Sequence, residues 1–368
     1  MILAVVVVGR YNDSLYNKVS FSRYLPEQPG LVFYDRFRTN DKNYMIMNYS
    51  AITDTTCKIQ DYEGNLVYEF PKGACAFTEH GEMFHINSSV NFFSEKGEML
   101  WTSEPLSNHH SVMYQRQSGE LAILTHEKQG EFKMADSILI FNRKGEKTFH
   151  LKSIDILSEI QRVIKRDLVI RGKGYEFSPG ESVTHFNSAQ ILGENPLENK
   201  IPAFKRNNIL VSCYLQSLIF IIDRSSGKIV WAKVFSKEYS EGVHTPQLLK
   251  SGSILMFSNR RRYDNYSGYK YSALIEYNPL LDAIDWEYTG SPKVAFLSDR
   301  WGSVSPIGDD QYLVSYSTAG IAFQVDRDGR ILWEYHTPPL ENGEPTPMLE
   351  VISAPRAFVD PQIRAWRE

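Results

Sequence analysis

One short sequence pattern recurs six times along this chain and constrains its fold more than any other feature. Each copy has an apolar β-prone run, a turn with Asp, Asn or Lys and usually Gly, and a second β-prone run with an aromatic residue. A single hairpin cannot bury its apolar face alone, so repeats at intervals of roughly 50 residues predict a β-propeller with one copy in the outer part of each blade. The six copies are Ile59–Phe70, Phe92–Trp101, Ile140–Leu151, Ile221–Val234, Glu276–Tyr288 and Gln324–Tyr335.

A second strand–turn–strand pattern precedes these hairpins, as in Ser111–Thr125, Thr245–Ser258 and Ser303–Tyr316. Two strands from each pattern give the four strands of one blade. We therefore predict an all-β protein with a six-bladed β-propeller over residues 31–338. Residues 1–30 would form an N-terminal arm or anchor stub, and residues 339–368 a C-terminal tail that wraps the surface or caps the last blade.

One stretch, residues 153–166, departs from the β pattern. Its apolar residues recur at helical spacing, and Ser153 stands where an N-cap is expected. The stretch predicts a short helical insertion that packs on the propeller, with docking of a partner protein on this helix or on a propeller face as the alternative. The residues at helical spacing are Ile154, Leu157, Ile160 and Ile164.

The composition excludes some classes of function. The aromatic content of 13% suits pleated sheets, and the net charge of −4 comes from interspersed residues of both signs. A nucleic-acid partner is not expected, because such proteins carry a basic patch or stripe. Cys57, Cys75 and Cys213 are too few for a disulfide framework, and they allow either a Cys57–Cys75 bond or three free buried thiols.

The N-terminal segment MILAVVVVGRYNDS contains an apolar run too short to span a bilayer. It also lacks the basic start and the small-residue cleavage site of a full signal peptide. One interpretation is the stub of a membrane anchor or signal, which places the protein in the periplasm or elsewhere outside the cytoplasm. The other is a buried edge strand.

Three consecutive predicted blades carry histidine at the start of the innermost strand, namely His110, His185 and His244. The innermost strands of a propeller line its central channel, so equivalent positions in successive blades should converge there. The corresponding segment of the next blade contains Arg300, which could add positive charge. Histidines on turns or outer strands are expected to be structural or solvated: His80, His85, His126, His150 and His336.

Clustered neutral imidazoles suit nucleophilic and acid–base chemistry on an anionic group, or a transition-metal site. Cysteine ligands and tight His-x-His spacing are lacking here, and acidic residues near these segments are few. We therefore expect no metal.

At these histidine segments the sequence resembles the bacterial arylsulfotransferase family, the PAPS-independent aryl-sulfate sulfotransferases with a six-bladed propeller. The resemblance covers about residues 29–338 and is strongest in VTHFNSAQIL (183–192), LIFIIDRSSGKIVW (218–231) and VHTPQLLKSGSILMFSN (243–259). It implies transfer of a sulfuryl group from one phenol to another through a sulfohistidine, with small aryl sulfates and phenols as ligands and no cofactor.

The resemblance also assigns roles to particular residues. His244, with Thr245 beside it, matches the nucleophile of the family. His185 and Asn187 match the residues that hold and polarise the sulfuryl oxygens, and His110 matches the histidine of the earlier blade, a role that its neighbour His109 could also take.

Tyr214 stands where the family commonly has an arginine. A phenol donates one hydrogen bond but brings no positive charge to the sulfuryl group, so Arg260 or Arg300 would have to compensate from another loop. This departure leaves a second hypothesis open, in which the propeller is not catalytic and serves as a ligand-binding or scaffold subunit of an envelope complex.

Overall fold

The computed structural model describes most of the chain. The described residues are 29–39, 42–50, 55–70, 72–130, 132–168, 183–235, 242–259, 271–291, 294–298, 301–340, 343 and 345–367. Residues 1–28 of the predicted N-terminal arm or anchor stub therefore lie outside the described residues, and so do Arg260 and Arg300.

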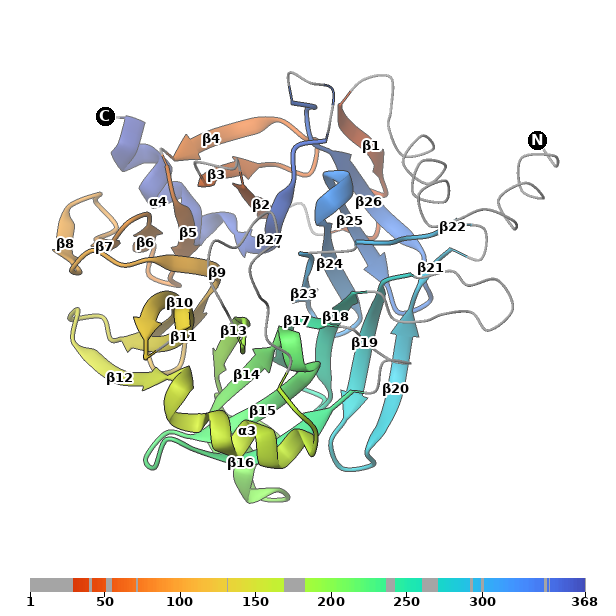
Figure 1. The fold of residues 1–368 in the computed structure, drawn as a ribbon. Coiled ribbons are helices and arrows are strands. Elements are labelled where there is room, and N and C mark those ends of the chain that lie inside the picture. Colours follow the sequence, from red (N-terminus) through yellow and green to blue (C-terminus); the bar gives the residue numbers. More distant parts are fainter. Residues whose placement is uncertain are drawn as a thin grey trace.

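The strands form six antiparallel sheets arranged around a central axis, which confirms the predicted six-bladed β-propeller (Figure 1). From the inner to the outer edge, blade 1 contains β27 (Met348–Pro355), β2 (Asn43–Ser50), β3 (Thr55–Gln60) and β4 (Leu66–Phe70). Blade 2 contains β5 (Ala74–Phe77), β6 (Met83–Ile86), β7 (Val90–Phe93) and β8 (Met99–Thr102). Blade 3 contains β9 (Asn108–Gln115), β10 (Glu120–Gln129), β11 (Phe132–Phe141) and β12 (Lys147–Lys152).

The other three blades follow in the same order. Blade 4 contains β13 (Phe186–Ile191), β14 (Ile209–Cys213), β15 (Leu218–Asp223) and β16 (Lys228–Val234). Blade 5 contains β17 (Gly242–Leu248), β18 (Ile254–Asn259), β19 (Ala273–Asn278) and β20 (Ala283–Tyr288). Blade 6 contains β23 (Ser303–Ile307), β24 (Gln311–Tyr316), β25 (Ile321–Asp326), β26 (Ile331–His336) and β1 (Gly30–Tyr34).

Short elements connect these strands. A two-stranded sheet of β21 (Gly290–Ser291) and β22 (Val294–Ala295) follows blade 5. Single turns of 3-10 helix are formed by η2 (Pro202–Phe204), η3 (Tyr214–Gln216) and η4 (Ser317–Ala319).

The six repeated hairpins form the third and fourth strands of the six blades, counted from the axis; these are the two outer strands, as predicted, except in blade 6, where β1 lies outside them. Their tryptophans join neighbouring blades, because in three blades the indole N–H donates to a main-chain carbonyl in the outer turn of the next blade. These bonds are Trp101 Nε1 to Arg143 O at 2.9 Å, Trp286 Nε1 to Arg327 O at 2.8 Å, and Trp333 Nε1 to Tyr62 O at 2.9 Å.

Both ends of the described chain close the ring. β27 pairs with β2 as the innermost strand of blade 1, and β1 pairs with β26 on the outer edge of blade 6. The propeller therefore extends beyond the predicted boundary at residue 338, and the tail does more than wrap the surface or cap the last blade. Without β27, one edge of β2 would leave its main-chain donors and acceptors without ladder partners at the centre of the molecule.

The chain ends in α4 (Arg356–Arg367), which packs against blades 1 and 2 (Figure 1). The Trp366 ring lies 5.3 Å from Phe70 of blade 1 and 5.2 Å from Phe93 of blade 2. The buried Gln362 side chain also donates to main-chain carbonyls of blade 2. α4 thus packs across blades 1 and 2, directly after the strand β27 that completes blade 1.

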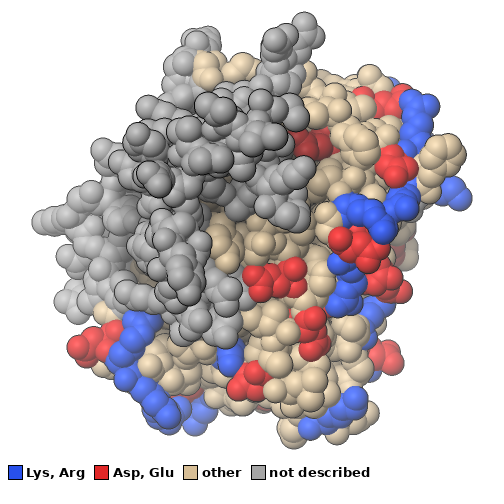
Figure 2. All heavy atoms as spheres, turned by 90° about the vertical axis from the view of Figure 1, so that its right-hand side faces the viewer, with Lys and Arg blue, Asp and Glu red and all other residues tan. Residues whose placement is uncertain are grey.

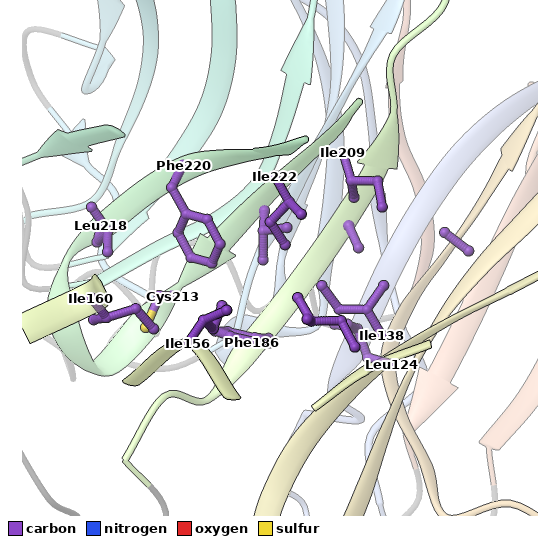
Figure 3. Packing of buried hydrophobic residues seen from close by; sticks show 14 of the residues in the cluster. Leu124, Ile138, Ile156, Ile160, Phe186, Ile209, Cys213, Leu218, Phe220 and Ile222 are labelled. Atoms are coloured by element: carbon purple, nitrogen blue, oxygen red, sulfur yellow. The ribbon is translucent and has the colours of Figure 1, made fainter. Parts of the chain in front are cut away.

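The predicted helical insertion comprises η1 (Ser153–Ile156) and α3 (Leu157–Ile164). Ile156, Ile160 and Ile164 are buried in the apolar cluster between blades 3 and 4, where Figure 3 shows Ile156 and Ile160 beside Phe186 and Cys213. The predicted cap is wrong, because neither η1 nor α3 has a side-chain N-cap hydrogen bond. The apolar face of this helix therefore packs against blades 3 and 4 of the same chain.

Cys57, Cys75 and Cys213 are free and buried. Figure 2 shows Lys and Arg interspersed with Asp and Glu over the described part of one face. Within the described ranges, no helix has both the length and the apolar character needed to cross a bilayer.

Candidate functional site

The inner strands of blades 3, 4 and 5 are irregular where they carry the predicted site residues. In β13, Phe186 pairs with Cys213 and Ser188 with Ser212, so Asn187 is an extra, bulged residue. β9 and β17 have similar bulges after His109 and after His244. Bulges re-aim side chains and are common next to functional sites.

The bulges are accompanied by left-handed backbone at non-glycine residues. His110, His185, Thr245 and Trp301 have φ values of 60°, 49°, 45° and 55°. Such conformations cost of order 1–3 kcal/mol each and cluster at functional sites. The sequence pattern aligns His244 with His110 and His185, but the left-handed residue of blade 5 is Thr245. Thr245 is therefore the backbone equivalent of those two histidines, and the predicted alignment of blade 5 is wrong by one residue.

The predicted convergence of His110, His185 and His244 is nevertheless present. The Nε2 atoms of His110 and His185 lie 3.0 Å apart, within hydrogen-bond distance. The ring of His110 lies 4.8 Å from that of His185 and 6.2 Å from that of His244, measured between centroids. Burial is the main cause that holds the pKa of His110 well below its ordinary value, and the surrounding histidines add to it. His110 is therefore neutral at neutral pH, and the His110–His185 contact is a bond between a ring N–H and a ring lone pair.

His244 is the most deeply buried of the three, with 4% of its surface exposed. Burial lowers its pKa to about 3, although the Asn259 carboxamide acts in the opposite direction. Its Nδ1 lies 2.8 Å from Nδ2 of Asn187, whose Oδ1 accepts a hydrogen bond from the Ser212 hydroxyl. The bulge in β13 thus places Asn187 where it orients the His244 ring.

Tyr214, the first residue of η3, lies between two of these histidines. Its ring centroid is 5.6 Å from that of His185 and 5.1 Å from that of His244. This position depends on Gly242, because a Cβ there would lie 2.1 Å from Cε2 of Tyr214. Tyr214 therefore belongs to the site.

Thr245 is not available for the predicted role in substrate binding. It is 2% exposed, and its hydroxyl accepts a hydrogen bond from the main-chain N–H of Val304 at 3.1 Å. The left-handed backbone at Thr245 turns this side chain toward β23, so it ties blade 5 to blade 6.

Two residues that the sequence interpretation missed complete the cluster. His126 and Asp136 are directly opposite each other in the β10–β11 hairpin, and His126 stacks on His109 with ring centroids 3.5 Å apart. Asp136 Oδ1 lies 3.1 Å from Nε2 of His109 and 3.2 Å from Nε2 of His126. The sequence pattern predicts His126 on a turn or an outer strand, but it lies on β10, the second strand from the axis, and its side chain is largely buried. His109 contacts the same carboxylate.

The sequence signal for this pair is its spacing about the β10–β11 turn, because residues at equal distances on either side of a hairpin turn lie opposite each other. His126 and Asp136 have this spacing. Burial alone would raise the pKa of Asp136, but its contacts with His109 and His126 lower this pKa well below the ordinary value. The expectation of no metal site relied on a scarcity of acidic residues near the histidines. Asp136 is an acidic residue in contact with His109 and His126, so this argument against a metal site no longer holds.

No family model matches the chain, and no curated protein matches it. Among solved structures, it is similar to a protein of unknown function from Bacteroides caccae, with TM-score 0.54, 14% identity and coverage of 84% of this chain and 98% of that one. It is also similar to a streptogramin B lyase, with TM-score 0.46, 11% identity and coverage of 88% and 97%. At such identities the likeness to the Bacteroides protein concerns the fold alone.

Proposed function

We propose that this propeller transfers a sulfuryl group between phenols through a sulfohistidine on His244. The single observation that carries the proposal is the convergence of His110, His185, His244 and Asn187 from the inner strands of three blades. A transferring sulfuryl group bears negative charge on its oxygens, and donors aimed at that charge lower the barrier. The imidazole N–H groups and the carboxamide are donors of this kind.

The buried environment of His244 supports its role as nucleophile. A pKa of about 3 leaves the ring neutral at neutral pH, with one nitrogen lone pair available. The Nε2 lone pair attacks sulfur, an N–S bond forms, and the S–O bond to the aryl group breaks, so that the phenolate leaves with the bonding electron pair. In the second half, the acceptor phenol oxygen attacks sulfur and the N–S electron pair returns to Nε2. The acceptor proton passes to a neutral imidazole of the His110–His185 pair.

The tautomer of His244 decides whether this attack can occur. Attack by Nε2 requires the proton on Nδ1, and Asn187 must then present its carboxamide oxygen to that N–H. A half-turn of the amide meets this requirement, because the Ser212 hydroxyl can accept from the amide as well as donate to it. Asn187 and Ser212 are therefore the positioning residues of the nucleophile.

The test is transfer from 4-nitrophenyl sulfate to a phenol acceptor. We expect nitrophenolate release by the wild type and by His150→Gln, a control at a partly exposed histidine of β12. We expect no release by His244→Gln, and a sulfuryl group on the His244 peptide in mass spectra of the wild type with donor alone. Folded wild type that releases no nitrophenolate over the background of His244→Gln would refute the proposal for this donor class.

One observation favours a second candidate, a propeller that binds aryl ligands without turnover. His244 is 4% exposed, and the Tyr214 ring stands beside it in place of a cationic side chain. This candidate predicts that a phenol or an aryl sulfate binds, that binding weakens in Tyr214→Ala, and that no sulfuryl group is transferred. Calorimetric titration with 4-nitrophenyl sulfate, together with the release assay, separates the two candidates. A role in an envelope complex and a location outside the cytoplasm stay predictions from the sequence.

A further inference from the structure

Asp136 is a carboxylate with no exposed surface next to the proposed transfer site. Its Oδ2 accepts hydrogen bonds from the Thr184 hydroxyl and from the main-chain N–H of Phe186, the latter at 3.0 Å. These two bonds fix the carboxylate and leave Oδ1 directed at His109 and His126. A fully buried carboxylate is costly unless a positive charge compensates it.

The two contacts of Oδ1 lie within hydrogen-bond distance, but their geometry is not that of a hydrogen bond. Nε2 of His109 and Nε2 of His126 lie 3.1 and 3.2 Å from it, yet none of these three buried atoms has a partner with hydrogen-bond geometry. The three atoms come from three strands of blade 3 and lie within 4.8 Å of one another. Three unpartnered ligand atoms around one point are the arrangement expected where a cation belongs.

We propose that His109, His126 and Asp136 bind a divalent transition-metal ion of the zinc class. Two imidazole nitrogens and one carboxylate oxygen are the ligand set of many open tetrahedral zinc sites. With metal–ligand distances of about 2.0–2.2 Å, neighbouring ligand atoms in a tetrahedron are about 3.4 Å apart, close to the separations observed here. The stacked rings must diverge for both lone pairs to meet at the ion, which requires rotation of one ring about its Cβ–Cγ bond.

The position of this cluster gives the ion a use. The ring of His185 lies 6.2 Å from that of His109 and 6.3 Å from that of His126, so the cluster lies next to the transfer site. A divalent ion with one carboxylate and two neutral histidines carries a net positive charge, which Tyr214 does not supply. This catalytic consequence rests on the proposed function, but metal binding itself does not.

The experiment uses the full chain, stripped with chelator and then exposed to Zn²⁺ or Co²⁺, with unbound metal removed by gel filtration. We expect one metal ion per chain in the wild type and in His150→Gln, with the visible absorption of tetrahedral Co²⁺. Asp136→Asn and His126→Gln should each weaken Zn²⁺ binding by at least the roughly 10–100-fold that loss of an outer-sphere partner costs. Two variants are used because Asp136→Asn could impair folding, which circular dichroism would reveal.

Several outcomes would overturn the proposal. Folded wild type that retains no more metal than His126→Gln has no such site, and its carboxylate is then compensated by a proton. Wild-type stoichiometry and affinity in both variants would place the ion elsewhere. Metal content is measured without turnover, so the two proposals fail separately. Bound Zn²⁺ without sulfuryl transfer supports the site and refutes the function, and sulfuryl transfer by protein that retains no Zn²⁺ in the binding experiment does the reverse.

Discussion

Acidification should destabilise this protein, and His244 allows the effect to be worked out. Burial lowers the pKa of His244 to about 3 in the folded state, against 6.5 for an unperturbed histidine. Between these values the unfolded chain binds a proton that the folded chain excludes. The free energy of unfolding is therefore undiminished above pH 6.5 and falls by about 1.4 kcal/mol per unit as the pH decreases toward the folded pKa. Between pH 6.5 and pH 4 the loss from His244 alone is about 3 kcal/mol.

Neighbouring groups act in the same direction. Burial also lowers the pKa values of His110 and His109, so both resist protonation in the folded state. The contacts of Asp136 with histidines lower its pKa, which adds a loss of stability only at pH values below its ordinary pKa of 3.8. The total loss should therefore exceed the contribution of His244.

The assay is urea unfolding at a series of pH values from about 7 to 4, followed by tryptophan fluorescence with the m-value checked at each pH. His244→Gln removes the titrating ring and should make the decrease in stability shallower by about 1.4 kcal/mol per pH unit. His150→Gln is the matched control and should follow the wild type. Equal pH dependence in the wild type and His244→Gln would show that His244 is not buried as a neutral ring.

Three further predictions concern packing and orientation in the same molecule. Gly242→Ala should destabilise the fold by about 1–3 kcal/mol by displacing the Tyr214 ring, and Tyr214→Ala in the same chain should restore most of the loss in urea unfolding. Trp333→Phe leaves a carbonyl of the next blade unpaired and should cost at least about 1–3 kcal/mol, more than Trp101→Phe in a partly exposed position. Asn187→Asp places a carboxylate next to a ring nitrogen and should raise the pKa of that imidazole above about 3, which NMR titration measures. An unchanged value would contradict the assigned contact.

The repeated hairpins could be predicted because their signals are local. Apolar runs, turn residues and tryptophans recur within each copy, and each hairpin forms from residues adjacent in sequence. The helical spacing of Ile160 and Ile164, which are buried as the helix predicts, is local in the same sense. Convergence of His110, His185 and His244 followed from these repeats, because equivalent positions in successive blades surround one axis.

Features that depend on pairing distant segments could not be predicted. The partner of β2 is β27, about 300 residues away, and nothing in either strand alone specifies the other. The Asp136 carboxylate reaches His109 only because the β10–β11 hairpin folds against β9.

The sequence by itself determined the number of blades, the repeated hairpins and the convergence of His110, His185 and His244 near the axis. The tertiary structure decided which strand closes the ring, which of two adjacent residues faces the site, and that a buried carboxylate lies among the imidazoles. The physical reason is that one bulged residue shifts every later side chain to the other face of a strand. Only the hydrogen-bond ladder with the neighbouring strand fixes where that residue is inserted. In β17 the bulge begins after His244, so Thr245 takes the backbone position that the sequence pattern assigns to His244.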